Sequence, residues 1–123
     1  MNAPLQAPRV IVAVSPPSRQ RIRAILPDWE LRFVDSEAQL QRELAERRCD
    51  MLIVGAHFEQ SNAIAAVERA AARKESIPVV AIRGRPCTTP LGARNFIDLL
   101  EYRDDALGNA RVRAMLERLL YVR

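Results

Sequence analysis

Short apolar runs alternate along the chain with longer segments whose apolar residues recur every three or four positions. Four runs have the length and the β-branched composition of strands in a parallel sheet: 9–15, 29–35, 51–56 and 77–84. Three segments between them have helical periodicity: 19–26, 37–48 and 63–75. This alternation predicts a parallel sheet with helices on both faces, and right-handed crossovers place the carboxyl ends of its strands at one edge.

Polar residues and prolines mark where the predicted helices begin and end. Ser18 is predicted to cap the first helix, and Pro27 ends it. Ser36 followed by Gln39 fits a capping box for the second helix, and Asn62 is the predicted cap of the third. The second strand, which alternates in polarity before this capping box, is predicted to lie near a sheet edge.

The last third of the chain ends in a predicted helix that begins at Asp105 or Asn109. Its apolar stripe consists of five residues: Val112, Met115, Leu116, Leu119 and Leu120. The stretch 91–102 has two interpretations that periodicity does not separate. It is either a helix capped by Thr89 with Pro90 in the first turn, or a fifth strand in "NFIDLL".

The loops at the carboxyl ends of the strands are the first place to look for function, because ligands of open parallel sheets bind there. Arg83 and Arg85 lie in one such loop, and their two guanidinium groups could hold a phosphate or a carboxylate. His57 and Phe58 follow the third strand in another. No readable motif pairs His57 with a nucleophile, so an ordinary loop position is favoured over a base or a phosphate acceptor.

Composition narrows the class of protein. The chain has 123 residues, of which 49% are hydrophobic, and it is predicted to form one domain over 9–123 after a flexible N-terminus at 1–8. Cys49 and Cys87 are interpreted as reduced thiols, and no apolar run or leader-like start is present, so we expect a cytoplasmic protein away from membranes. A single histidine excludes a site of several imidazoles, and we expect no metal and no cofactor.

The net charge of +4 is modest, and it does not favour nucleic-acid binding. Four arginines lie in the terminal helix region: Arg111, Arg113, Arg118 and Arg123. They are interspersed with Glu117 and apolar residues, which is more typical of a solvated outer face than of a helix that enters a groove.

Several runs resemble a response-regulator receiver domain, the flavodoxin-like fold of the chemotaxis regulator. The likeness is best in "SEAQLQRELAERRCDMLIVG", and it extends to "RVIVAVSPPSRQRIRAIL", "IPVVAIRG" and "GARNFI". It covers most of 9–123 and implies one α/β domain with a central parallel sheet of four or five strands flanked by helices. The segment between the fourth strand and the last helix is remodelled, because 84–92 is too short for the helix that receivers carry there.

The resemblance also identifies the positions where receivers carry out phosphoryl chemistry. The phosphoacceptor aspartate is matched by Gly55, and the metal-binding acids after the first strand are matched by Val14 and Ser15. The hydroxyl residue that ends the fourth strand is matched by Arg83, and the fifth-strand lysine falls near Leu99. The only lysine of the chain precedes the fourth strand, so it cannot replace the missing one. The resemblance therefore implies a pseudo-receiver.

We accordingly expect a non-catalytic interaction domain of bacterial two-component signalling that works without phosphorylation. Its partner would be another signalling protein, and residues 88–123 could form a homodimer. The first alternative is a sensor of small anions, or a small enzyme, on a flavodoxin-like scaffold. The second is nucleic-acid binding through arginines.

Overall fold

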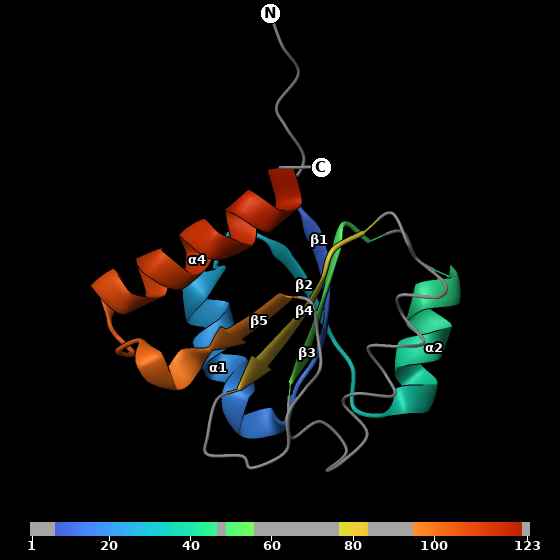
Figure 1. Cartoon of the computed structure of the whole chain (residues 1–123). Helices are drawn as coiled ribbons and strands as arrows, with labels where there is room; N and C mark the ends of the chain where they lie inside the picture. Colours follow the sequence, from blue (N-terminus) through green and yellow to red (C-terminus); the bar gives the residue numbers. More distant parts are fainter. Residues whose placement is uncertain (1–6, 47–48, 56–76, 84–94, 122–123) are drawn as a thin grey trace, which may run out of the picture.

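A computed structural model describes residues 7–46, 49–55, 77–83 and 95–121. These residues form a parallel sheet with helices on both faces (Figure 1). The elements in chain order are β1 (Arg9–Ala13), α1 (Pro16–Ile25), β2 (Glu30–Phe33), α2 (Glu37–Glu46), β3 (Met51–Gly55), β4 (Val79–Arg83), β5 (Asn95–Asp98), the 3₁₀ helix η1 (Leu99–Glu101) and α4 (Ala106–Tyr121). In the described residues no helix has the length and the apolar composition needed to cross a bilayer.

The five strands are arranged in the order β2-β1-β3-β4-β5, and every neighbouring pair is parallel. The chain builds one side of the sheet with β2 and then returns past β1 to build the other side. The order therefore reverses between β1 and β3, which is the switch point of flavodoxin-like sheets. This arrangement confirms the predicted fold class, and it also confirms that the second strand lies at an edge.

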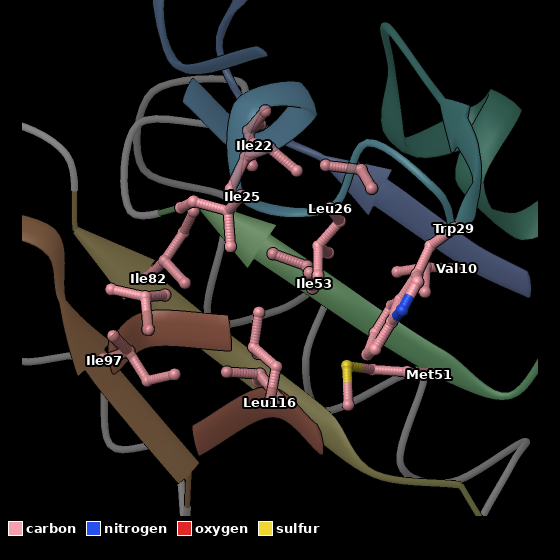
Figure 2. Packing of buried hydrophobic residues seen from close by; sticks show 14 of the residues in the cluster. Val10, Ile22, Ile25, Leu26, Trp29, Met51, Ile53, Ile82, Ile97 and Leu116 are labelled. Atoms are coloured by element: carbon pink, nitrogen blue, oxygen red, sulfur yellow. The ribbon is translucent and has the colours of Figure 1, made fainter. Parts of the chain in front are cut away.

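The sheet has an apolar core on each face because both faces are covered (Figure 1). Alternate residues of β1 serve the two cores: Val10 and Val12 face α1 and α4, whereas Ile11 and Ala13 face α2. The larger core lies under α1 and α4. Figure 2 shows Ile22 of α1 and Leu116 of α4 together with residues of the strands, and the rest of the predicted stripe of α4 belongs to the same cluster.

Helix α1 begins earlier than predicted. Its first residues are Pro16 and Pro17, and Ser15 occupies the cap position instead of Ser18. Proline fits here because the first turn of a helix needs no amide donors and its fixed φ matches the helix. The predicted end is confirmed, since the helix stops at Ile25 before Pro27.

The other two described helices begin where side chains were predicted to cap them. Ser36 Oγ accepts a hydrogen bond from Gln39 N at 3.1 Å, and Gln39 Oε1 accepts one from Asp35 N at 2.8 Å. In α4, Asp105 Oδ1 accepts a hydrogen bond from Gly108 N at 2.8 Å, so Asp105 is the cap and Asn109 is not. The predicted helix at 63–75 and its cap Asn62 lie outside the described residues.

The structure distinguishes between the two interpretations of 91–102. Residues Asn95–Asp98 form the fifth strand, which pairs with β4, and Leu99–Glu101 form a single 3₁₀ turn. β5 is short because Asp98 caps the following turn by accepting a hydrogen bond from Leu100 N at 3.0 Å. Thr89 and Pro90, the proposed helix start, lie outside the described residues.

Candidate functional site

The carboxyl ends of the strands meet at one edge of the sheet, which we call the rim. Within the described residues the rim is formed by Val14 and Ser15 after β1, Gly55 at the end of β3, Arg83 at the end of β4 and Asp98 at the end of β5. It lies at the switch point, where ligands of open parallel sheets bind.

Gly55 and Val14 are in direct contact at the centre of the rim. A Cβ atom at Gly55 would lie 3.2 Å from Val14 Cγ1 and 3.3 Å from Val14 Cα. Both residues are buried. The sequence placed both positions at the carboxyl edge of the sheet, and the structure brings them together, so that a side chain at Gly55 would press against Val14.

Ser15 takes part in the rim mainly through its backbone. It occupies the cap position of α1 with extended backbone, and its carbonyl oxygen accepts a hydrogen bond from Ser18 N at 3.0 Å. Its hydroxyl makes no capping hydrogen bond to the helix. The end of β1 thus offers one half-buried hydroxyl next to Val14 and no carboxylate.

The charged part of the rim is an ion pair between the ends of β4 and β5. Arg83 and Asp98 are paired in register, and the Arg83 guanidinium donates a hydrogen bond to Asp98 Oδ2. The Asp98 side chain is 9% exposed and that of Arg83 is 31% exposed. The hydrogen bond from Arg83 holds the pKa of the Asp98 carboxyl below its usual value, although burial acts in the opposite direction.

Asp98 is the rim residue that sequence reasoning missed. Sequence reasoning offered Arg83 and Arg85 as two guanidinium groups that could hold an anion, whereas the structure pairs Arg83 with the Asp98 carboxylate. The resemblance placed the position of the fifth-strand lysine near Leu99, which is buried as the first residue of η1. The signal that could have identified Asp98 is its position: an acidic residue directly after a short apolar run caps the next turn.

A second ion pair lies beyond the rim at the end of β2. Arg19 donates one hydrogen bond to Val34 O at 3.2 Å and another to the Asp35 carboxylate. The same guanidinium lies 5.6 Å from the centre of the Phe33 ring. Arg19 therefore joins the first turn of α1 to the end of β2, and this carboxylate also has an arginine partner.

The segment after β5 is fixed by an arginine of α1. Arg21 donates hydrogen bonds to three backbone carbonyls, at 2.9 Å to Leu99 O, 2.8 Å to Tyr102 O and 3.1 Å to Arg103 O. Its side chain is 16% exposed, so these carbonyls have a donor in place of water. Arg21 thereby positions the turn that carries Asp98.

The remaining predicted site residues, His57, Phe58 and Arg85, lie outside the described residues, as does Cys87. Cys49 is buried just before the start of β3. Within the described ranges, no three side chains of the metal-binding kinds gather closely enough to hold an ion.

Comparison with known proteins gives the fold. No protein-family model matches the sequence, and no curated protein matches it. Solved structures do match it. The receiver domain of a sensor histidine kinase from Pseudomonas aeruginosa aligns with a TM-score of 0.73 at 14% identity, over 93% of this chain and 98% of that one. The phosphorylated cyanobacterial phytochrome response regulator RcpA aligns with a TM-score of 0.71 at 12% identity, over 95% and 96% of the two chains.

A response regulator from Hahella chejuensis is more similar in sequence. It aligns with a TM-score of 0.67 at 21% identity, over 94% of this chain and 97% of that one. Matches of this kind extend over nearly the full length of both chains. The chain therefore has the fold of response-regulator receiver domains.

Proposed function

We propose that this chain is a pseudo-receiver: a signalling domain of the two-component type that binds another protein without being phosphorylated and without catalysing a reaction. The observation that carries the proposal is the contact between Gly55 and Val14. A Cβ atom at Gly55 would lie 3.2 Å from Val14 Cγ1, so an acceptor side chain at the position that the resemblance identifies would require Val14 to move.

The charges around that contact support the same proposal. A hard cation such as Mg²⁺ needs several carboxylate or carbonyl oxygens. Among the described residues at the carboxyl ends of the strands, the Asp98 carboxylate accepts a hydrogen bond from Arg83, and the Asp35 carboxylate accepts one from Arg19. By contrast, the Pseudomonas aeruginosa receiver domain was solved with magnesium in its active-site cleft, and RcpA was solved in a phosphorylated form.

The partner surface that we propose includes the loops that follow β3 and β4, with His57, Phe58, Arg83 and Arg85 as contact residues. The last part of the chain, 88–123, is the proposed surface for a homodimer. A switch in such a domain would come from a partner that binds one conformation better than another, since that is how any ligand shifts an equilibrium.

The experiment has two arms, of which the first tests phosphorylation by a small phosphodonor and the second tests partner binding. The chain is incubated with acetyl phosphate and Mg²⁺, and its intact mass is expected to stay unchanged, whereas a receiver domain with its acceptor aspartate gains one phosphoryl group. A stable phosphoprotein would overturn the proposal.

A second arm of the series tests partner binding. The tagged chain is used to capture proteins from cells that express it naturally, with and without acetyl phosphate. We expect the same partner in equal amounts under both conditions, and a reduced amount with Arg85→Glu. Arg42→Gln, on the exposed side of α2, is the matched control. Capture that requires the phosphodonor would contradict phosphorylation independence.

The anion-sensor alternative would require a displacement step. An anionic ligand at Arg83 has to compete with the Asp98 carboxylate, which already accepts a hydrogen bond from that guanidinium. A panel of phosphorylated metabolites tests this alternative by thermal shift, because a ligand at 100 times its Kd stabilises a fold by about 2.7 kcal/mol.

A further inference from the structure

The strand β2 forms an edge of the sheet, and its outer side presents backbone groups to solvent. The amides of Glu30 and Val34 donate to carbonyl oxygens on the β1 side at 2.9 and 3.1 Å. Alternate residues of a parallel strand bond to opposite sides, so Leu31 and Phe33 direct their N–H and C=O groups away from β1. Within the described ranges, no strand pairs with this outer side of β2.

Both ends of this open edge are closed by hydrogen bonds within the chain. The preceding outward amide, Trp29 N, donates to Leu26 O at 3.3 Å. The following one, Asp35 N, donates to Gln39 Oε1 at 2.8 Å. The outward backbone groups available for pairing are therefore those of Leu31 and Phe33, and two such residues suit one short extended segment.

A groove follows β2 on each face of the sheet. The α1-side groove has a volume of about 430 Å³ and is lined by Arg23, Leu26, Pro27, Trp29, Leu31 and Phe33. The α2-side groove has a volume of about 410 Å³, and its lining includes Arg9, Ile11, Glu30, Arg32, Glu46 and Cys49. Since side chains of an added strand alternate between the two faces, one set would enter each groove.

The charges at the two grooves differ. In the α1-side groove the Arg23 guanidinium lies 4.6 Å from the centre of the Phe33 ring, and α1 contains no acidic residue. This groove therefore has an apolar floor and a positively charged border, which suits apolar side chains next to a carboxylate. At the α2-side groove two ion pairs are present. Arg9 Nε lies 3.1 Å from Glu30 Oε2, and Arg32 Nε lies 2.8 Å from Oε1 of Glu43 in α2. Uncharged polar side chains suit such internally paired charges.

We propose that the outer edge of β2 binds an extended peptide segment of a partner protein, with apolar and acidic side chains on one face and uncharged polar side chains on the other. Backbone hydrogen bonds to Leu31 and Phe33 would supply affinity, and the two grooves would supply specificity. An antiparallel pair of two β2 edges would put the arginine-bearing α1 helices of both copies on the same side. The charge thus favours an acidic partner over a second copy.

The test uses the octapeptide Thr-Glu-Thr-Val-Thr-Val-Thr-Glu, acetylated at its N-terminus and amidated at its C-terminus. Its threonines would lie on one face of the added strand, and its valines and glutamates on the other. Trp29 lines the groove and is the only tryptophan of the chain, so its fluorescence reports occupancy. We expect saturable binding, slower hydrogen exchange at the Leu31 and Phe33 amides, and affinity about two- to fivefold lower for Arg23→Gln. Arg42→Gln, an exposed arginine on α2, should bind like the unmodified chain.

Three results would overturn the proposal. They are the absence of saturable binding, equal binding of a peptide N-methylated along its backbone, and slower exchange at β5 in place of β2. Concentration-dependent dimerisation that slows exchange at Leu31 without peptide would identify a second copy as the occupant and refute the partner assignment. The proposal does not depend on the rim: a phosphorylated chain would refute the pseudo-receiver function and leave this binding edge standing.

Discussion

Replacing Asp98 with asparagine removes one charge from the rim and keeps the shape of the side chain. The asparagine oxygen can still accept the hydrogen bond from Leu100 N, which Asp98 accepts at 3.0 Å. What is lost is both the charge and the acceptor Oδ2 of the Arg83 hydrogen bond, because the amide nitrogen takes the place of that oxygen. Asp98→Asn therefore isolates the ion pair from the cap of η1.

The size of the effect follows from the exposure of the two side chains. Two unit charges about 4 Å apart attract by about 4 kcal/mol at an effective dielectric constant of 20. Desolvation of Asp98, which is 9% exposed, offsets much of this attraction, and water reaches Arg83, which is 31% exposed. Hydrogen bonds to charged groups contribute about 1.5–3 kcal/mol when buried, so we expect a coupling of about 1–2 kcal/mol for this partly exposed pair.

A double-mutant cycle measures this coupling. Asp98→Asn, Arg83→Gln and the double variant are unfolded in urea at pH 7 and followed by Trp29 fluorescence, with Arg42→Gln as the control for an exposed arginine. We expect the double variant to lose less stability than the sum of the losses of the two single variants, and the difference is the coupling energy. A coupling below about 0.5 kcal/mol would refute the inference that the pair holds the ends of β4 and β5 together.

The pH dependence gives an independent measure of the same pair. Because the pKa of Asp98 is lowered in the folded chain, its contribution to stability is complete above the unfolded pKa of about 3.9. It is lost as the pH falls through the lower, folded value. The free energy of unfolding of the unmodified chain should therefore fall more steeply below pH 4 than that of Asp98→Asn, and parallel curves would contradict the assignment.

Three further changes test other parts of the structure by urea unfolding. Gly55→Asp should cost about 2–4 kcal/mol, because its side chain meets Val14 and buries a carboxylate, and acetyl phosphate should still leave its mass unchanged. Arg21→Lys should cost about 1.5–3 kcal/mol of stability, since one ammonium group cannot replace a planar guanidinium that donates hydrogen bonds to three carbonyl oxygens. Gly108→Ala should cost about 1–3 kcal/mol of stability, because the added Cβ would lie 1.9 Å from Arg103 O. Without such a contact, the same change inside a helix usually raises stability by about 1 kcal/mol. A stable Gly55→Asp, a neutral Arg21→Lys or a stabilised Gly108→Ala would each contradict its contact.

The layered fold was predictable because short runs with strand-like composition alternate along the sequence with segments of helical periodicity. Buried strands such as β1 and β3 need apolar side chains on both faces, and this leaves a clear pattern in the sequence. The start of α1 was predicted too late because Ser18 was taken as its cap, whereas Pro16 and Pro17 form its first turn.

The rim was predictable only in part. The sequence pattern indicates parallel strands whose carboxyl ends meet at one edge, but it leaves their order open, and the contact of Val14 with Gly55 depends on the pairing of β1 with β3. The pairing of Arg83 with Asp98 depends on the length of β5, and this strand ends early because of a local hydrogen bond to Leu100 N. Periodicity over such a short segment does not reveal its register or its end.

The two proposed binding surfaces lie toward opposite sides of the sheet. From β2 to β4 the sheet order passes β1 and β3, and three strand spacings amount to about 14 Å. Changes more than about 10 Å apart without shared partners usually have additive effects. We therefore expect Arg23→Gln to weaken an edge-bound peptide equally in the presence and absence of Arg83→Gln. Two binding sites are coupled only where each ligand binds two conformations of the protein with different affinity. Additivity would mark a fixed adaptor that holds two proteins at once, whereas strong coupling would require a second conformation of the sheet that both partners can bias.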